Sequence, residues 1–209
     1  MIRGIYGKPR AGKTTLSARL ARLNFLKLCV CNKVPILRRV LHPYDVIYCT
    51  DETISHTVHI SYENLGKWLP PRNSLIILEE AGIGLDSRNY KKLDAAAARL
   101  FALHGHIGCD IVWSSQTADV DKKLRNRTHV LSLVEKSWIP GVSRVIPVNY
   151  AVDVDDATHK LDDMYSRPRG LRIILLALIG RVKYIYRPLW YRYFDSFYDD
   201  GEYPLDGPC

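Results

Sequence analysis

The chain has 209 residues, 47% of them hydrophobic, which excludes a disordered protein and is enough for one α/β domain with a small appendage. The formal charge is +8, but residues 195–209 hold five of the 22 acidic side chains and neither lysine nor arginine, so residues 1–194 carry +13. A body this basic favours a polyanionic partner, either nucleic acid or an anionic membrane surface.

The segment GIYGKPRAGKTT, residues 4–15, fits the P-loop pattern GxxxxGK[ST]. In such a loop the backbone N–H groups cradle phosphates, the lysine reaches the β and γ phosphates, and the hydroxyl binds Mg²⁺. A short β-type run at residues 2–6 precedes the loop, and leucines near helical spacing follow it at positions 16, 20, 23 and 28. The sequence therefore predicts a site for ATP and Mg²⁺, with a phosphate cradle formed by Gly7, Lys8, Pro9, Arg10, Ala11, Gly12, Lys13, Thr14 and Thr15.

Residues 30–70 are the least informative part of the chain and indicate only a strand-rich excursion. The next motif, SLIILEEAG at residues 74–82, has four apolar residues followed by Glu79 and Glu80. A run of this length that ends in acids is typical of a central parallel strand whose carboxyl end opens on a nucleotide crevice. We expect Glu79 to hold Mg²⁺ together with Thr14, and Glu80 to be the base that activates water.

Residues 91–104 repeat apolar side chains with the period of a helix, and CDIVWSSQ at residues 109–116 indicates another buried strand. This strand ends in polar residues, the last of which is Gln116. An amide beside the two acids suits a sensor of the γ phosphate. The alternative is a strand that simply emerges into solvent.

A basic cluster follows, with Lys122, Lys123, Arg125 and Arg127 within six residues. Three interpretations stay open: an arginine finger that reaches the nucleotide of a neighbouring subunit, a contact with DNA phosphates, or a solvated turn. Arg88, which follows the two acids, is a further candidate for the finger.

The last third of the chain predicts a hairpin over residues 129–152 and a break at residues 166–170. We therefore expect an ATPase domain over residues 1–165 and an extension with an acidic tail over residues 166–209. Residues 171–194 mix apolar, aromatic and basic side chains. They suit a hydrophobic flap packed on the domain or on a neighbouring subunit, an interfacial membrane segment, or a nucleic-acid surface.

Four ordered segments, GKPRAGKTT, LIILEEAGIGLDSR, LHGHIGCDIVWSSQ and VDKKLR, together resemble the Zot-like ATPase family (zonular occludens toxin domain). This family includes the assembly ATPases of filamentous phages. The resemblance covers residues 1–150, and RPLWYRYFDSF at residues 187–197 is similar to the tail that follows the domain in some members.

The resemblance implies a P-loop motor of the FtsK/HerA division that drives phage DNA export or virion morphogenesis at the inner membrane. Carried over by position, the resemblance implies that Lys13 and Thr14 bind phosphate and Mg²⁺. It implies that Glu79 and Glu80 are the metal-binding and catalytic acids, and that Gln116 is the sensor. The chain departs from the pattern in two ways. Glu79 replaces the usual aspartate, and the usual membrane span is not evident, so a packaging-type ATPase of the same division stays open.

The cysteine pattern and the apolar runs indicate the compartment. Five cysteines without regular spacing favour a reduced, intracellular environment, and Cys29, Cys31, His104 and His106 lack the spacing of a tetrahedral metal site. We expect no signal peptide, because the P-loop pattern follows within the first residues. The longest apolar run, residues 173–179, is shorter than the roughly 20 residues that span a bilayer. We expect a protein of the host cytoplasm, either soluble or peripheral at the inner membrane.

Together these patterns predict an α/β fold of the RecA-like P-loop NTPase type, with a mainly parallel central sheet and a hydrophobic, aromatic C-terminal extension. The expected function is ATP hydrolysis by a homo-oligomeric ring that moves phage or mobile-element DNA. The catalytic residues would be Lys13, Glu80, Gln116 and Arg125. Two alternatives are a P-loop small-molecule kinase and a nucleotide-switched membrane-assembly adaptor with little hydrolysis.

Overall fold

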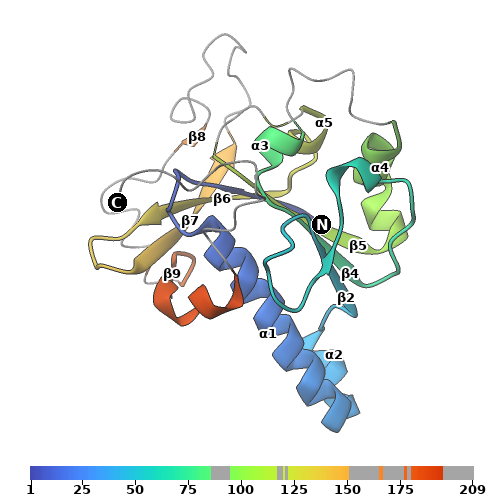
Figure 1. Cartoon of the computed structure of the whole chain (residues 1–209), viewed down its shortest axis with the longest axis horizontal. Coiled ribbons are helices and arrows are strands. Elements are labelled where there is room, and N and C mark those ends of the chain that lie inside the picture. Colours follow the sequence, from blue (N-terminus) through green and yellow to red (C-terminus); the bar gives the residue numbers. More distant parts are fainter. Residues whose placement is uncertain are drawn as a thin grey trace, which may run out of the picture.

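The computed structural model describes residues 1–85, 95–116, 120, 122–150, 165–166, 177 and 180–194. Its nine described strands form one sheet in the order β3-β2-β4-β5-β1-β6-β7-β8, with β9 also paired to β7 (Figure 1). The strands are β1 (Ile2–Tyr6), β2 (Val46–Cys49), β3 (Val58–His59), β4 (Ser74–Leu78), β5 (Cys109–Ser115), β6 (Val130–Lys136), β7 (Val142–Tyr150), β8 (Tyr165–Ser166) and β9 (Lys183–Tyr186). The helices are α1 (Lys13–Lys33), α2 (Arg38–Leu41), α3 (Ala81–Gly84), α4 (Ala95–Ile107) and α5 (Lys122–Arg125), with short 3₁₀ turns η1 (Pro35–Leu37), η2 (Tyr62–Asn64), η4 (Arg187–Leu189) and η5 (Tyr191–Tyr193).

The sheet is mainly parallel, as predicted. Strands β1 to β6 run in the same direction, β7 is antiparallel to β6, and β8 and β9 are antiparallel to β7. The predicted hairpin is thus the β6–β7 pair. Strand β5 lies between β1 and β4, so the strand before the P-loop, the acid-bearing strand and the strand that leads to Gln116 all end at the same edge of the sheet.

Helices cover both faces of the sheet. Alternate residues of a strand point to opposite faces, so Ile76 belongs to a core that includes Phe101 of α4, whereas Ile77 belongs to a second core that includes Ala18 of α1. Near-continuous apolar strands such as β4, all five of whose residues are buried, are what a sheet covered on both faces requires. Figure 1 shows α1 and the segment around β9 on one side and α4 on the other.

The buried face of α1 is formed mainly by small residues. Ala18 and Ala21 are 1% and 0% exposed, whereas Leu16 and Leu20 are only partly buried and Leu23 is 38% exposed. The predicted helix is confirmed, but its leucines flank the contact with the sheet. Small side chains let the helix approach the sheet closely, with its first turn next to the P-loop.

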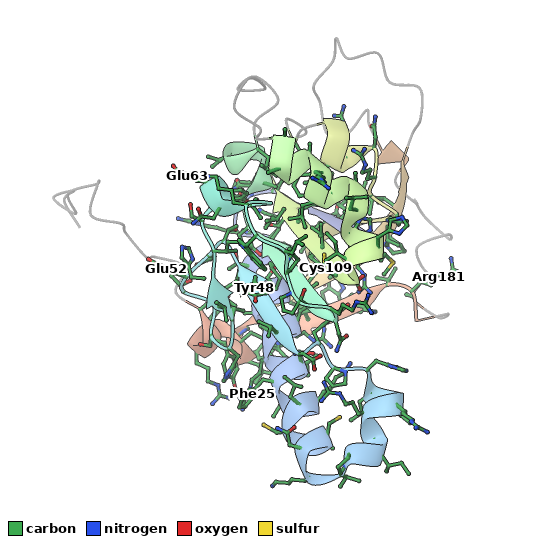
Figure 2. The ribbon with its side chains drawn as sticks, turned by 90° about the vertical axis from the view of Figure 1, so that its right-hand side faces the viewer. Phe25, Tyr48, Glu52, Glu63, Cys109 and Arg181 are labelled. Carbon is green, nitrogen blue, oxygen red and sulfur yellow. The ribbon has the colours of Figure 1, made fainter. Side chains whose placement is uncertain are left out.

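The C-terminal half of α1 projects from the body together with η1 and α2 (Figures 1 and 2). Figure 2 shows Phe25 on this projection. The projection carries no acidic residue, because the first one in the chain is Asp45. The exposed apolar side chains of the projection include Leu26, Val30, Val34, Ile36 and Val40. Among the helices in the described ranges, none is long and apolar enough to cross a membrane.

The described part of the C-terminal extension folds back on the rest of the chain. Strand β9 pairs with β7, and Ile185 and Phe194 are buried in the core that includes α1. The backbone N–H of Ser55 donates to the carbonyl oxygen of Tyr193 over 2.9 Å. This agrees with the interpretation of the segment as a flap packed on the domain, although most of the apolar run at residues 173–179 lies outside the described residues.

Candidate nucleotide-binding site

The predicted P-loop connects β1 to α1 at the carboxyl edge of the sheet. Gly12 caps the helix with a left-handed φ of 102°, and α1 begins at Lys13. The first N–H groups of a helix have no partner within it, and the helix dipole adds partial positive charge there. The start of α1 is therefore suited to bind phosphate oxygens.

Two glycines of the loop are required by close packing. A β-carbon at Gly12 would lie 2.5 Å from Ser143 Oγ and 3.0 Å from Arg187 Cδ, and one at Gly7 would lie 2.5 Å from a backbone oxygen of β6. The Ser143 hydroxyl also donates a hydrogen bond to the carbonyl oxygen of Ala11. Residues far along the chain, on β6, β7 and η4, thus hold the back of the P-loop.

The side chain of Lys13 lies inside the loop and is 5% exposed. Its ammonium donates to the carbonyl oxygen of Gly7 over 3.1 Å and lies 3.7 Å from Glu80 Oε1. Burial lowers the pKa of Lys13, and the carboxylates of Glu80 and Glu79 oppose that effect. The loop therefore holds a buried cation between carbonyl oxygens and an acid.

Glu79 lies beneath the loop and is 7% exposed. Ser114 Oγ donates to Glu79 Oε2 over 2.8 Å, and Thr14 Oγ1 lies 3.5 Å from the same oxygen. Glu79 Oε1 is buried and has no hydrogen-bond partner among the described residues, and burial raises the pKa of this carboxyl. An unsatisfied carboxylate oxygen near a threonine hydroxyl is a donor set that Mg²⁺ prefers, so these residues fit the metal that the fold implies.

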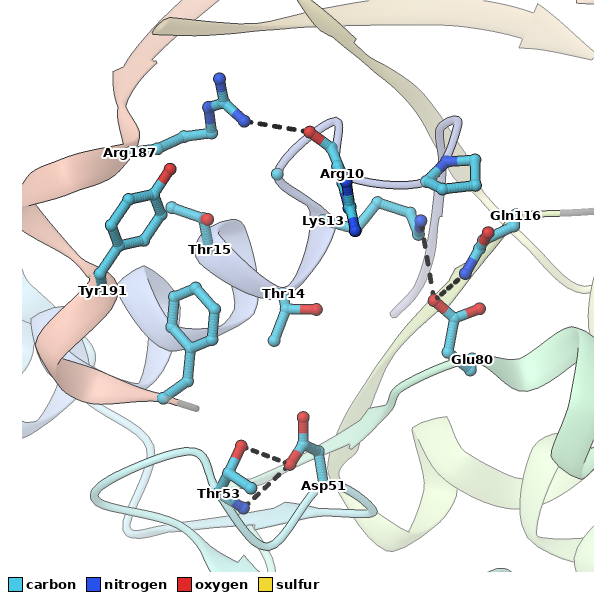
Figure 3. Close-up of a pocket in the computed structure, with 13 residues that line it drawn as sticks. Arg10, Lys13, Thr14, Thr15, Asp51, Thr53, Glu80, Gln116, Arg187 and Tyr191 are labelled. Atoms are coloured by element: carbon cyan, nitrogen blue, oxygen red, sulfur yellow. Dashed lines mark hydrogen bonds and ion pairs between the residues drawn. The ribbon is translucent and has the colours of Figure 1, made fainter. Parts of the chain in front are cut away.

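Glu80 follows directly but is more accessible, with 35% of its side chain exposed. Its backbone adopts the left-handed conformation, with φ 51°, where it caps α3. Gln116 Nε2, from the tip of the neighbouring strand, donates to Glu80 Oε1 over 2.8 Å. Figure 3 shows the ammonium of Lys13 and the amide of Gln116 converging on the carboxylate of Glu80.

These side chains open into a cavity of about 820 Å³, which is within the usual size range of ligand sites. The cavity is lined by Pro9, Arg10, Gly12, Lys13, Thr14, Thr15, Asp51, Thr53, Glu80, Gln116, Arg187, Tyr191 and Phe194. It combines a helix start, a lysine, hydroxyls and two adjacent acids, one lining the cavity and one beneath it, which is the chemistry that a triphosphate with a divalent metal requires.

Comparison with known proteins places the fold. No protein-family model matches the chain, and no curated protein matches it. The N-terminal domain of zonular occludens toxin from Neisseria meningitidis is similar in structure, with a TM-score of 0.51 and 16% identity over 79% of this chain and 98% of that one. The chain has a RecA-like P-loop NTPase fold.

Two other solved structures are similar to this chain with lower TM-scores. The DNA-packaging ATPase B204 from Sulfolobus Turreted Icosahedral Virus has a TM-score of 0.45 and 13% identity, over 70% of this chain and 91% of that one. The RadB recombinase has a TM-score of 0.44 and 14% identity, over 70% of this chain and 79% of that one.

Most of the residues predicted from sequence meet in this cavity. Lys8 and Ala11 belong to the loop, and Glu79 lies beneath it. Of the arginines considered as fingers, Arg125 and Arg127 do not line the described cavity. Arg125 is on α5, Arg127 follows it, and Arg88 lies outside the described residues.

Five lining residues were not predicted: Asp51, Thr53, Arg187, Tyr191 and Phe194. Asp51 accepts hydrogen bonds from the backbone N–H and hydroxyl of Thr53, at 2.9 and 2.7 Å. A signal for Asp51 was present, because the apolar run VIYC of β2 leads into polar residues, as β4 and β5 do. No local signal places Arg187, since its position depends on the pairing of β9 with β7.

Proposed function

We propose that this chain is an ATP-hydrolysing motor subunit of the Zot-like type within the FtsK/HerA division, which moves phage or mobile-element DNA. The observation that carries the proposal is the meeting of Lys13, Glu80 and Gln116 in one cavity, from three neighbouring strand ends. The insertion of β5 between β1 and β4 supports it, because this strand brings the amide beside the acid.

Nucleotide binding begins at the P-loop. The N–H groups at the start of α1 bind the phosphate chain, and the ammonium of Lys13 moves from its carbonyl partners to the β and γ phosphates. Thr14 and Glu79 would hold Mg²⁺. When bound, that ion neutralises charge on the phosphate oxygens.

Hydrolysis then depends on Glu80 and Gln116. Glu80 orients the attacking water and accepts its proton, a role that suits an accessible carboxylate beside the cavity. Gln116 holds the carboxylate through its amide nitrogen and contacts the γ phosphate. Because the lysine lies 3.7 Å from Glu80 before nucleotide binds, the approach of the triphosphate separates the pair and frees the base.

The proposal that DNA is the partner rests on the net positive charge of the chain. Residues 1–194 carry a formal charge of +13, and such a body attracts a phosphate backbone without reading its sequence.

We propose a ring of identical subunits in which an arginine, Arg125, Arg127 or Arg88, reaches the neighbouring nucleotide. In this proposal residues 1–165 form the ATPase domain and residues 166–209 the extension. The ring acts in the host cytoplasm, either soluble or peripherally at the inner membrane.

The test is steady-state ATP hydrolysis by the purified chain and its Lys13→Ala variant, with and without single- and double-stranded DNA at low and moderate salt. Activity that depends on Lys13 and rises with DNA supports the motor. ADP formation that requires an added small-molecule acceptor, with the phosphoryl group transferred to that acceptor, would point to a kinase. Tight ATP binding with negligible turnover in the presence of every DNA would favour the assembly adaptor.

A further inference from the structure

The far wall of the cavity comes from the C-terminal extension. Arg187, Tyr191 and Phe194, here called the C-terminal wall, line the same cavity as Lys13 although they lie more than 170 positions away in sequence. Figure 3 shows Arg187 and Tyr191 beside Thr15, on the side opposite Glu80 and Gln116. The cavity therefore has two chemically different ends.

The direction in which a nucleotide lies follows from these two ends. Water attacks the γ phosphate, so the γ phosphate must lie at the end with Glu80 and Gln116. The helix start and Lys13 bind the middle of the triphosphate. The nucleoside is then left at the other end, against the C-terminal wall.

The aromatic part of the wall has an open surface. Tyr191 is 47% exposed although it lines a cavity, whereas Phe194 is 8% exposed and belongs to the core beneath. Their rings meet edge to face with centroids 6.1 Å apart, which braces the tyrosine. An aromatic ring that is supported from behind and open to a cavity is suited to stack on a nucleobase.

Arg187 is fixed beside the phosphate cradle. Its Nη1 donates to the carbonyl oxygen of Arg10 over 3.0 Å, and its Cδ crowds Gly12. Its Nε is buried and has no hydrogen-bond partner among the described residues. Arg187 is therefore a further cation beside the P-loop, in addition to Lys13 and Arg10, with donor capacity left to bind an anion.

The wall is held in place from several directions before any ligand binds. Strand β9 pairs with β7 just before Arg187, and the backbone N–H of Ser55 donates to Tyr193 just after Tyr191. The guanidinium of Arg22 lies 5.2 Å from the centre of the Tyr193 ring, and that of Arg19 lies 5.8 Å from the centre of Trp190. A wall anchored in this way loses little freedom when it binds.

We propose that the C-terminal wall is the nucleoside-recognition surface of this site: Tyr191 stacks on the base, and Arg187 binds the triphosphate in the same subunit. The inference rests on the proposed binding of nucleotide at the P-loop. It gives the extension a function in ligand binding. It also places one phosphate-binding arginine within the subunit, separate from any arginine that a neighbour supplies.

The test compares two ligands on the full chain by calorimetry: Mg-ATP, and Mg-tripolyphosphate, which has the phosphates without the nucleoside. Tyr191→Ala should weaken ATP binding about tenfold or more, the usual loss when a base-stacking aromatic is removed, and leave tripolyphosphate binding unchanged. Tyr191→Phe should keep both. Arg187→Gln should weaken both ligands about tenfold, because a charged donor is lost.

Tyr184→Ala and Arg181→Gln are matched controls, since both residues are exposed, neighbour the wall in sequence and do not line the cavity. If Tyr191→Ala and Arg187→Gln keep normal ATP affinity while Lys13→Ala loses it, the proposed role of the C-terminal wall is wrong. The proposed binding of nucleotide at the P-loop is then retained. Equal weakening of ATP and tripolyphosphate by Tyr191→Ala would overturn the stacking role. Failure of the unmodified chain to bind ATP would overturn the proposed function itself.

Discussion

Gln116 Nε2 donates a hydrogen bond of 2.8 Å to Glu80 Oε1, which joins the tips of two neighbouring parallel strands. The same carboxylate oxygen lies 3.7 Å from the ammonium of Lys13. One oxygen of Glu80 is thus held by an amide on one side and faced by a cation on the other. This fixes where the carboxylate lies before substrate arrives, as a general base requires.

Glu80→Gln is expected to retain ATP binding and to lower turnover about 10²- to 10⁴-fold, because the amide cannot accept a proton from water. The change keeps the shape of the side chain and leaves Glu79 and Lys13 in place. Single-turnover hydrolysis and equilibrium binding, measured on the same preparation, separate the two effects. Unchanged turnover would remove Glu80 from the mechanism.

Gln116→Ala is expected to lower turnover about 10²-fold with little change in ATP affinity, since a positioned donor is lost from the reacting end only. In this variant Glu80 keeps its ionic contact with Lys13 but loses the amide that orients it. Gln116→Glu would place a like charge against Glu80 and should be at least as slow. Wild-type turnover in the alanine variant would show that the strand simply ends in solvent.

The parts of this site that follow local patterns could be predicted from sequence, and the parts that depend on distant pairing could not. Three parts of the site each follow an apolar strand: the loop at Gly7 to Thr15, the two acids, and Gln116. One rule, that polar site residues follow an apolar run, therefore predicts all three. The same rule applied to β2 predicts Asp51, because the apolar run of this strand leads directly into polar residues.

The C-terminal wall illustrates the opposite case. Arg187 lies at the P-loop only because β9 pairs with β7, and the register of that pair is set by contacts across the sheet. The face of α1 that packs on the sheet could not be predicted either, because the leucines indicate a helix but Ala18 and Ala21 make the contact. Local periodicity shows that an element exists, and packing decides what it touches.

Gly12→Ala is expected to abolish measurable ATP binding and to destabilise the protein. Its φ of 102° disfavours any side chain, and a β-carbon would lie 2.5 Å from Ser143 Oγ. Gly105→Ala is the matched control, because Gly105 lies within α4 and its β-carbon would meet nothing within 4 Å. That change should stabilise the chain by about 0.5–1 kcal/mol, the usual gain for alanine in an exposed helix. Thermal unfolding of both variants measures the contrast, and equal effects would contradict it.

A pH dependence of stability is expected from Asp110, whose Oδ2 accepts a hydrogen bond of 2.6 Å from Tyr44 and whose Oδ1 pairs with the N-terminal ammonium. Burial alone would raise the pKa of Asp110, but the hydrogen bonds from the ammonium and from Tyr44 lower it below its usual value. A carboxyl whose pKa is lower in the folded state adds stability above its unfolded pKa, and that stability is lost as the pH falls through the folded pKa.

Asp110→Asn should therefore lower the free energy of unfolding by about 1 kcal/mol at pH 7, and the difference from the unmodified chain should shrink below about pH 4, the range in which an unperturbed aspartate takes up its proton. Tyr44→Phe should act in the same direction, because it removes one of the hydrogen bonds that lower the pKa. Asp45→Asn, at an exposed pair with Arg38, is the control and should change stability little at either pH. Urea unfolding at pH 7 and pH 3 measures the difference. If Asp110→Asn costs as much at pH 3 as at pH 7, the loss comes from packing, and the charge of Asp110 does not stabilise the fold.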